Sequence, residues 1–199
     1  MVVVCVCLAV ALVFIYRASQ EEGLSHDITV NEGIKQIETF QISSDSVEVH
    51  TSAEGTIYSG ENRDGRAHAK IVASLTVDPK DWGGVAFYMP ASWYVVDMTS
   101  SYPEEVPQRN PEDEVAVWTN ENSSRPWSGW IEIGRDRSYR LTGGGTGTVV
   151  IELVSEQPVP GVAYVTVSVG TDKRNGYRVQ GTDSIQVPIW DSTSGGHEE

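Results

Sequence analysis

Most of the chain beyond residue 28 shows the alternation of apolar and polar side chains that is typical of β-strands. Because successive side chains of a strand point to opposite faces, such a pattern predicts one buried face and one outer face. The pattern is clearest in residues 66–77 and 161–169, whose apolar faces comprise Ala67, Ala69, Ile71, Ala73 and Leu75 in the first segment and Ala163, Val165, Val167 and Val169 in the second.

Further short strands are predicted at residues 28–30, 37–42, 46–51, 55–60, 82–89, 93–98, 115–119, 130–133, 148–154 and 184–190, the last as part of a closing strand over residues 179–189. Turn signals separate them, including Asp64-Gly65 and Asn175-Gly176, which favour the positive φ angles of hairpin turns. Pro188 predicts an edge or terminal position for the last strand. Residues 31–40 also fit a short helix, so two alternatives stay open there.

About ten short strands with no long helical pattern between them predict an all-β fold. We expect an Ig-like, Greek-key β-sandwich over residues 28–190, preceded by an N-terminal apolar helix and followed by a disordered tail at residues 191–199. The strand pattern resembles that of Ig-like and cohesin-like modules of prokaryotic surface proteins. The resemblance is limited to this pattern and transfers no functional residue.

The apolar segment at residues 2–16 begins at Val2, ends at Tyr16 and contains no charged residue. Its length lies between that of a signal-peptide core and that of a full membrane span. No Lys or Arg precedes the segment and no small-residue cleavage site closes it, so we favour an uncleaved membrane anchor over a cleaved signal peptide. Packing as a buried helix is the third alternative. Residues 1–17 are thus an anchor or signal segment, and residues 18–27 are a tether.

The orientation of this segment rests on opposing observations. Arg17, directly after the apolar run, favours a cytoplasmic domain by the positive-inside rule. Cys5 and Cys7 lie within the apolar run, so the folded domain carries no thiol for catalysis, metal binding or a disulfide. The acidic, thiol-free domain favours an extracytoplasmic location, membrane-anchored or secreted, and is more typical of a prokaryotic protein.

The chain carries 28 acidic and 14 basic residues and a formal net charge of −14. A surface of this sign repels phosphate backbones, so nucleic acid is not an expected partner. The charge therefore leaves proteins, glycans and cations as ligand classes to consider.

Four of the six tryptophans are candidate binding residues, because Trp82, Trp93, Trp127 and Trp130 lie beside glycine, serine or proline turn residues. Exposed aromatic rings stack on sugars or anchor protein interfaces. The alternative is that these rings fill the interior of the sandwich.

Carboxylates gather between residues 101 and 114, where Glu112, Asp113 and Glu114 are consecutive. Oxygen ligands of this kind suit Ca²⁺, although the spacing matches no known calcium loop, and a solvated acidic loop is the alternative. The glycine-rich segment 142–148 lacks the Lys of a phosphate-binding loop and precedes a predicted strand, which favours a flexible hairpin loop.

We find no arrangement of residues typical of an active site, and we expect no required cofactor. The sequence therefore favours a non-enzymatic β-sandwich module of the cell envelope that mediates protein interaction, assembly or self-association. A carbohydrate-binding module that uses exposed tryptophans is the alternative, and a hydrolase is the third hypothesis.

Overall fold

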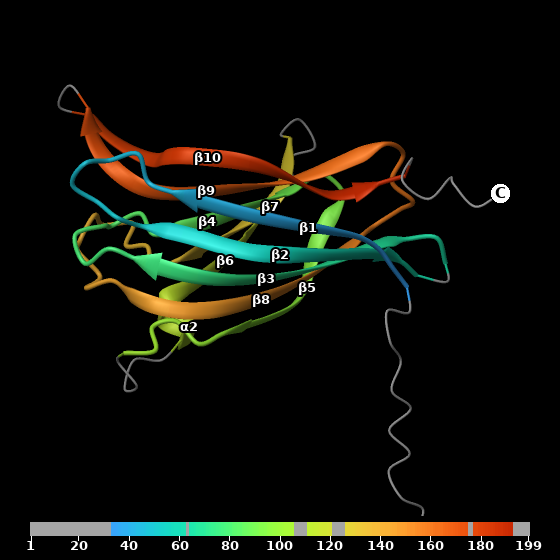
Figure 1. Cartoon of the computed structure of the whole chain (residues 1–199), viewed down its shortest axis with the longest axis horizontal. Helices are drawn as coiled ribbons and strands as arrows, with labels where there is room; N and C mark the ends of the chain where they lie inside the picture. Colours follow the sequence, from blue (N-terminus) through green and yellow to red (C-terminus); the bar gives the residue numbers. More distant parts are fainter. Residues whose placement is uncertain (1–32, 63, 106–110, 121–125, 175–176, 193–199) are drawn as a thin grey trace, which may run out of the picture. The chain divides into compact units, whose positions relative to one another are not determined.

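The computed structural model describes residues 33–62, 64–105, 111–120, 126–174 and 177–192. These residues form two antiparallel sheets of five strands each (Figure 1). Sheet A has the order β1 (Ile34–Ser43), β2 (Ser52–Glu61), β3 (Ala67–Val77), β8 (Gly145–Ser155) and β5 (Trp93–Ser100). Sheet B has the order β10 (Tyr177–Asp191), β9 (Val162–Arg174), β4 (Val85–Pro90), β7 (Trp127–Ile133) and β6 (Val115–Thr119). A single helical turn, α2 (Pro111–Glu114), precedes β6.

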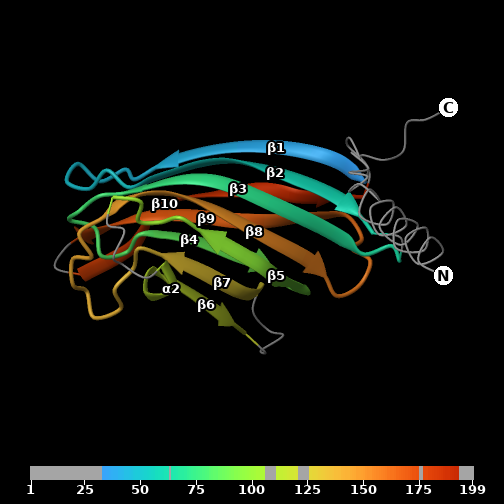
Figure 2. The same cartoon turned by 90° about the horizontal axis from the view of Figure 1, so that it is seen from below.

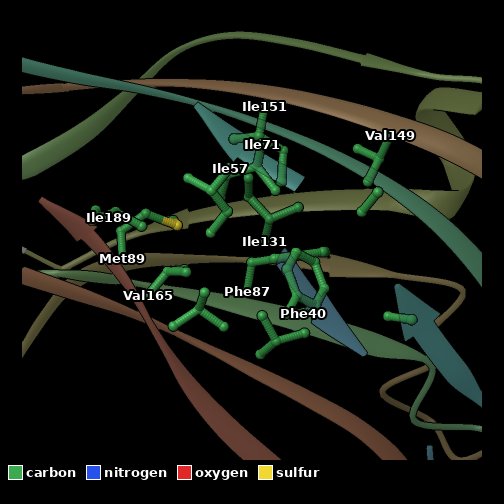
Figure 3. Packing of buried hydrophobic residues seen from close by; sticks show 14 of the residues in the cluster. Phe40, Ile57, Ile71, Phe87, Met89, Ile131, Val149, Ile151, Val165 and Ile189 are labelled. Carbon is green, nitrogen blue, oxygen red and sulfur yellow. The ribbon is translucent and has the colours of Figure 1, made fainter. Parts of the chain in front are cut away.

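The hydrophobic core lies between the two sheets (Figure 3). Sheet A contributes Phe40, Ile57, Ile71, Val149 and Ile151, and sheet B contributes Phe87, Met89, Ile131, Val165 and Ile189. Burial of each large apolar side chain stabilises the fold by about 1.5–3 kcal/mol, so this layer is the main source of stability. The prediction of an all-β, sandwich-like fold is confirmed.

The alternation read from the sequence matches the burial of the two clearest strands. All five predicted inward residues of β3 and all four of β9 are buried. The predicted edge position of Pro188 is also confirmed, because β10 is the outermost strand of sheet B and its register shifts between Pro188 and Trp190. Hydrophobic periodicity therefore located these strands and their faces correctly.

The strand predicted at residues 46–51 is wrong, because this segment is an irregular loop. The Ser44 hydroxyl accepts a hydrogen bond from the Ser46 backbone N–H, and the Ser46 hydroxyl accepts one from that of Glu48. Such local bonds offer the backbone an alternative to a sheet ladder. Val47 is 92% exposed, so the alternating pattern did not indicate a buried side chain at this position.

The structure also decides two segments whose state the sequence left open or predicted only in part, and the strand predicted at residues 37–42 is confirmed. Residues 31–40 fitted either a strand or a short helix, and from Ile34 onward they belong to β1, which pairs antiparallel with β2. The predicted flexible loop at residues 142–148 is wrong in its second half, because β8 begins at Gly145. A Cβ on Gly147 would lie 2.5 Å from the Cα of Tyr102, so glycine is required there by the close approach of this buried residue.

A buried carboxylate just before the start of β4 joins three parts of the chain. Asp81 is fully buried, and its Oδ1 accepts hydrogen bonds from the Thr171 hydroxyl at 2.6 Å and the Gly83 backbone N–H at 2.9 Å. Its Oδ2 accepts a hydrogen bond from the Thr51 hydroxyl. Asp81 therefore ties the loop after β1 and the start of β4 to β9.

The two sheets approach each other closely at one pair of edges. There β1 packs against β10, with the Ser44 and Thr182 hydroxyls 2.7 Å apart and the Lys35 ammonium 5.8 Å from the centre of the Trp190 ring. β5 and β6 form the other edge strands of the two sheets, and β6 is the lowest of the labelled strands in Figure 2.

The predicted anchor, tether and first strand, at residues 28–30, lie outside the described residues, as does the tail beyond residue 192. The predicted N-terminal apolar helix falls in the same part of the chain. Within the described ranges, no helix is long and apolar enough to cross a membrane.

Candidate binding site

The structure separates the four candidate tryptophans into two pairs. Trp93 is 2% exposed and Trp82 is 9% exposed, so neither presents a free ring face to a ligand. Trp82 packs edge-on against Tyr139, with ring centres 4.7 Å apart. Trp127 and Trp130, both on β7, are partly exposed on the outer side of sheet B. Only this second pair belongs to a candidate binding surface.

A β-bulge places Trp127 and Trp130 on the same side of the sheet. Residues three apart in a regular strand point to opposite faces. The register between β4 and β7 shifts between Met89 and Pro90, which face Gly129 and Trp127 respectively. The Ser128 hydroxyl within the bulge donates a hydrogen bond to the Pro90 carbonyl at 2.9 Å. The extra residue re-aims the Trp127 side chain toward the outer face.

Aromatic rings from three neighbouring strands form a row across this face. Trp118 on β6 is opposite Trp130 on β7, which is opposite Tyr88 on β4. The Trp118 and Trp130 rings lie 6.2 Å apart at 15°, and the Trp130 and Tyr88 rings lie 6.5 Å apart at 27°. Offset stacking of this kind adds about 0.5–1.5 kcal/mol per pair beyond simple burial.

A cluster of charged side chains lies beside Trp118 and Trp130, at one end of the row. Glu132 is 2% exposed, forms an ion pair with Arg135 and accepts hydrogen bonds from Arg137 at 2.9 and 3.1 Å. The Trp130 indole N–H donates to the same carboxylate at 3.2 Å. The Arg137 guanidinium lies 3.9 Å from the centre of the Trp118 ring, a cation–π contact.

A groove of about 410 Å³ continues the row on its other side. Its walls include Tyr88, Trp127, Val162, Tyr164, Thr166 and Gln186. None of the described residues that line it carries a charge, although the chain as a whole is strongly acidic. We call Tyr88, Trp118, Trp127, Trp130 and Tyr164 together the aromatic face.

The electrostatics of the face favour uncharged contacts. Burial, and secondarily the nearby Glu132 carboxylate, raise the pKa of the Tyr88 phenol, so this ring remains neutral at physiological pH. The two arginines more than balance the charge of Glu132, so the cluster carries one net positive charge beside Trp118, outside the uncharged groove. The face can therefore bind neutral or apolar groups by stacking and burial, with Thr166 and Gln186 as hydrogen-bonding side chains in the groove.

The calcium candidates do not form a ligand cluster within the described residues. Asp113 is exposed, Glu114 is partly buried, and the side chain of Glu112 lies outside the described part of the chain. Glu105 of the same acidic segment accepts hydrogen bonds from the backbone and hydroxyl of Thr146, which lower the pKa of its carboxyl group. Among the described residues, no group of three His, Cys, Asp or Glu side chains is placed to hold a metal.

Four residues of the site were missed at the sequence level: Tyr88, Trp118, Tyr164 and Arg137. Alternation did place Tyr164 on the outward face of its predicted strand, opposite to Ala163 and Val165. No local signal could show that β6, β7, β4 and β9 would be neighbours in one sheet.

His68, on the outer side of sheet A, makes stability depend on pH. Burial lowers its pKa, an effect that Glu152 partly opposes, and its buried Nδ1 has no hydrogen-bond partner among the described residues. Above the ordinary imidazole pKa of about 6.5, the ring is neutral in both the folded and the unfolded state. Below it the unfolded chain takes up the proton first, so stability falls until the pH has passed through the folded-state pKa.

We therefore expect a drop in melting temperature between about pH 7.5 and about pH 5.5 that is smaller in His68→Gln than in the wild type. Thermal unfolding followed by circular dichroism, at matched ionic strength, measures the melting temperatures of the wild type and of His68→Gln at the two pH values. Equal drops in the two proteins would remove His68 as the cause.

The sequence matches no known protein family and no characterised protein.

Proposed function

We propose that this chain is a non-enzymatic binding module of the cell envelope that contacts a protein partner through the aromatic face of sheet B. The observation that carries the proposal is the face itself, with five Trp and Tyr side chains from four neighbouring strands beside an uncharged groove. Trp, Tyr and Arg dominate the energetic centres of protein interfaces, whereas charged side chains are depleted there.

The geometry favours a protein over a glycan. Sugar stacking needs free ring faces, but Trp118, Trp130 and Tyr88 cover parts of one another, and Arg137 covers Trp118. Glycan recognition also requires several polar side chains for the sugar hydroxyls. Thr166 and Gln186 are the polar side chains of the described groove wall that lie on the outer face. A carbohydrate-binding module stays the alternative because Trp127 and Tyr164 flank the groove.

The strand order supports assignment to an Ig-like, Greek-key sandwich. β2-β3-β8-β5 corresponds to the A-B-E-D sheet of a constant-type Ig domain, and β10-β9-β4 corresponds to G-F-C. In this assignment β1 is an extra strand before strand A. The β6–β7 hairpin is an insertion between strands D (β5) and E (β8), and it extends the second sheet beyond strand C (β4). Three of the five aromatic residues of the face lie on this insertion. The proposed binding surface is thus an addition to a common framework.

The apolar segment at residues 2–16 supports a membrane-anchored or secreted, extracytoplasmic location for the module. Contact by stacking and apolar burial needs no cofactor. In this proposal the anchor holds the domain at the membrane and the aromatic face recruits or assembles the partner.

A photo-reactive phenylalanine analogue at Tyr164 tests the proposal in the full chain, expressed in the source cells. We expect illumination to give a discrete protein adduct at position 164. Trp127→Ala should reduce this adduct about 30-fold or more, because loss of an interface tryptophan costs about 2 kcal/mol or more. Immunoblotting and mass spectrometry measure its yield and identity.

The matched control carries the same probe at Tyr139, another half-exposed tyrosine, which packs against Trp82 outside the aromatic face. Adducts that are equal at both positions, or that are insensitive to Trp127→Ala, would contradict a protein site on the aromatic face. Retention of the chain on neutral polysaccharide, lost in Trp127→Ala, would instead favour the carbohydrate alternative.

A further inference from the structure

The four edge strands of the two sheets differ in how they are protected against pairing with another chain. Natural edge strands usually carry charges, prolines or bulges that prevent such pairing. In β1 the register shifts between Ile34 and Gln36, beside Lys35. In β5 it shifts between Val95 and Asp97. β10 has two register shifts and contains Pro188.

β6 has none of these features. Its register with β7 runs without interruption from Val115 to Thr119, and its sequence, Val-Ala-Val-Trp-Thr, contains no charge and no proline. Val117 points toward the inner side of the sandwich, opposite the buried Ile131, and yet is 50% exposed. This five-residue apolar edge, without a charge, a proline or a bulge in a chain with a net charge of −14, is suited to pairing with another strand.

The hydrogen-bond pattern shows which backbone groups the edge offers. Asn120 N–H donates to Ser128 C=O at 2.6 Å, and Gly134 N–H donates to Glu114 C=O at 2.9 Å. Facing residues of an antiparallel ladder alternate between bonded and non-bonded pairs. Even-numbered residues of β6 therefore bond to β7, and the odd-numbered ones, Val115, Val117 and Thr119, direct their N–H and C=O groups to the open edge.

We propose that β6 pairs antiparallel with β6 of a second copy of this chain, with the two-fold axis at Val117. In this register Val117 is opposite its own copy, and Val115 is opposite Thr119, so all outward backbone groups of both strands are satisfied. On the outer side, the large Trp118 is opposite the small Ala116. The strand is thus complementary to itself in backbone pairing and in side-chain size.

Local charge permits this contact although the whole chain is acidic. Nothing on β6 is charged, and the Arg137 guanidinium lies over Trp118 beside it. Each of the other three edge strands carries at least one acidic residue, namely Glu38 in β1, Asp97 in β5 and Asp183 in β10. Like-charge repulsion between the paired strands themselves is therefore weakest at β6, whose nearest described acidic residues, Asp113 and Glu114, precede the strand.

Pairing at β6 would also join the two aromatic faces. A two-fold axis perpendicular to the sheet keeps outer faces on the same side, and diagonal neighbours across an antiparallel pair lie about 7–8 Å apart. The two Trp118 rings occupy such positions. The dimer then presents one continuous aromatic band. Self-pairing depends on the β6 edge and not on the role of the aromatic face.

Cysteine cross-linking in the full chain tests the register directly. In a background of Cys5→Ser and Cys7→Ser, mild oxidation of Val117→Cys should convert most of the chain to a disulfide-linked dimer. Facing residues of a hydrogen-bonded pair have Cα atoms about 5.5 Å apart, which is within the disulfide range. The matched control is Val96→Cys on the β5 edge, because Val96 is also 50% exposed. Persistence of the Val117→Cys monomer, or equal cross-linking of Val96→Cys, would overturn the proposal.

Val117→Pro gives a second, independent measurement. The N–H that it removes faces the open edge, so the ladder with β7 keeps its bonds, and proline is tolerated on edge strands. Sedimentation of the full chain in mild detergent should show a dimer for the wild type and for Val96→Lys. Val117→Pro and Val117→Lys should be monomers with unchanged circular dichroism. A wild type that is monomeric at all accessible concentrations would refute self-pairing, whatever the outcome of the adduct experiment at Tyr164.

Discussion

Glu132→Ala is expected to lower the free energy of unfolding by about 3–5 kcal/mol. The carboxylate is buried, and removing it leaves the Arg135 guanidinium, itself mostly buried, without its ion partner. The Trp130 indole N–H and the Arg137 guanidinium lose their acceptor at the same time. Because Arg137 then no longer has a fixed position over Trp118, the aromatic face should also lose order. Urea unfolding followed by tryptophan fluorescence measures the stability.

Arg137→Ala is the control for the exposed part of the same cluster. Its side chain is nearly half exposed, and water screens its pairing with Glu132. It should therefore cost about 1 kcal/mol or less. A Glu132→Ala variant that is no less stable than Arg137→Ala would mean that the buried carboxylate contributes no more to the free energy of unfolding than its exposed partner.

Asp81→Ala is expected to cost about 3 kcal/mol or more, because three donors lose their acceptor in a water-excluded site. These donors are the hydroxyls of Thr51 and Thr171 and the backbone N–H of Gly83. The side chain also joins segments that are distant in sequence, so its loss should loosen the start of β4 in particular. Equilibrium unfolding together with amide hydrogen exchange at Gly83 tests both effects.

Thr171→Val is the matched comparison for Asp81. It removes one donor while keeping the shape of the side chain, and it leaves the other two bonds to the carboxylate in place. We expect a cost of about 1 kcal/mol. Equal costs for Thr171→Val and Asp81→Ala would indicate that the three bonds do not act through one shared acceptor.

The strands could be predicted because their signal is local. In β3 and β9 the two-residue period of apolar side chains coincides with the burial of every predicted inward residue. Residues 46–51 show the limit of the same signal. Their alternation is as regular as that of a strand, but the serine hydroxyls there bond to nearby backbone N–H groups, and a loop results.

The candidate site was only half predictable. Trp127 and Trp130 were identified from their position near a turn, and they do lie on the aromatic face. Trp82 and Trp93 had the same local signature but are buried. Burial of an aromatic ring depends on which strand lies across from it, and no short stretch of sequence contains that information.

The sequence by itself determined the class of fold, the inward faces of the clearest strands, the acidic character and the lack of a thiol in the domain. These properties depend on composition or on neighbours within a few residues. Only the tertiary structure decided which aromatic rings meet, because a single bulged residue, Ser128, re-aims Trp127, and because the sheet order makes β6, β7, β4 and β9 neighbours. It also decided that the strand without a charge, a proline or a bulge is an edge strand, since a strand becomes an edge only when the whole sheet has formed.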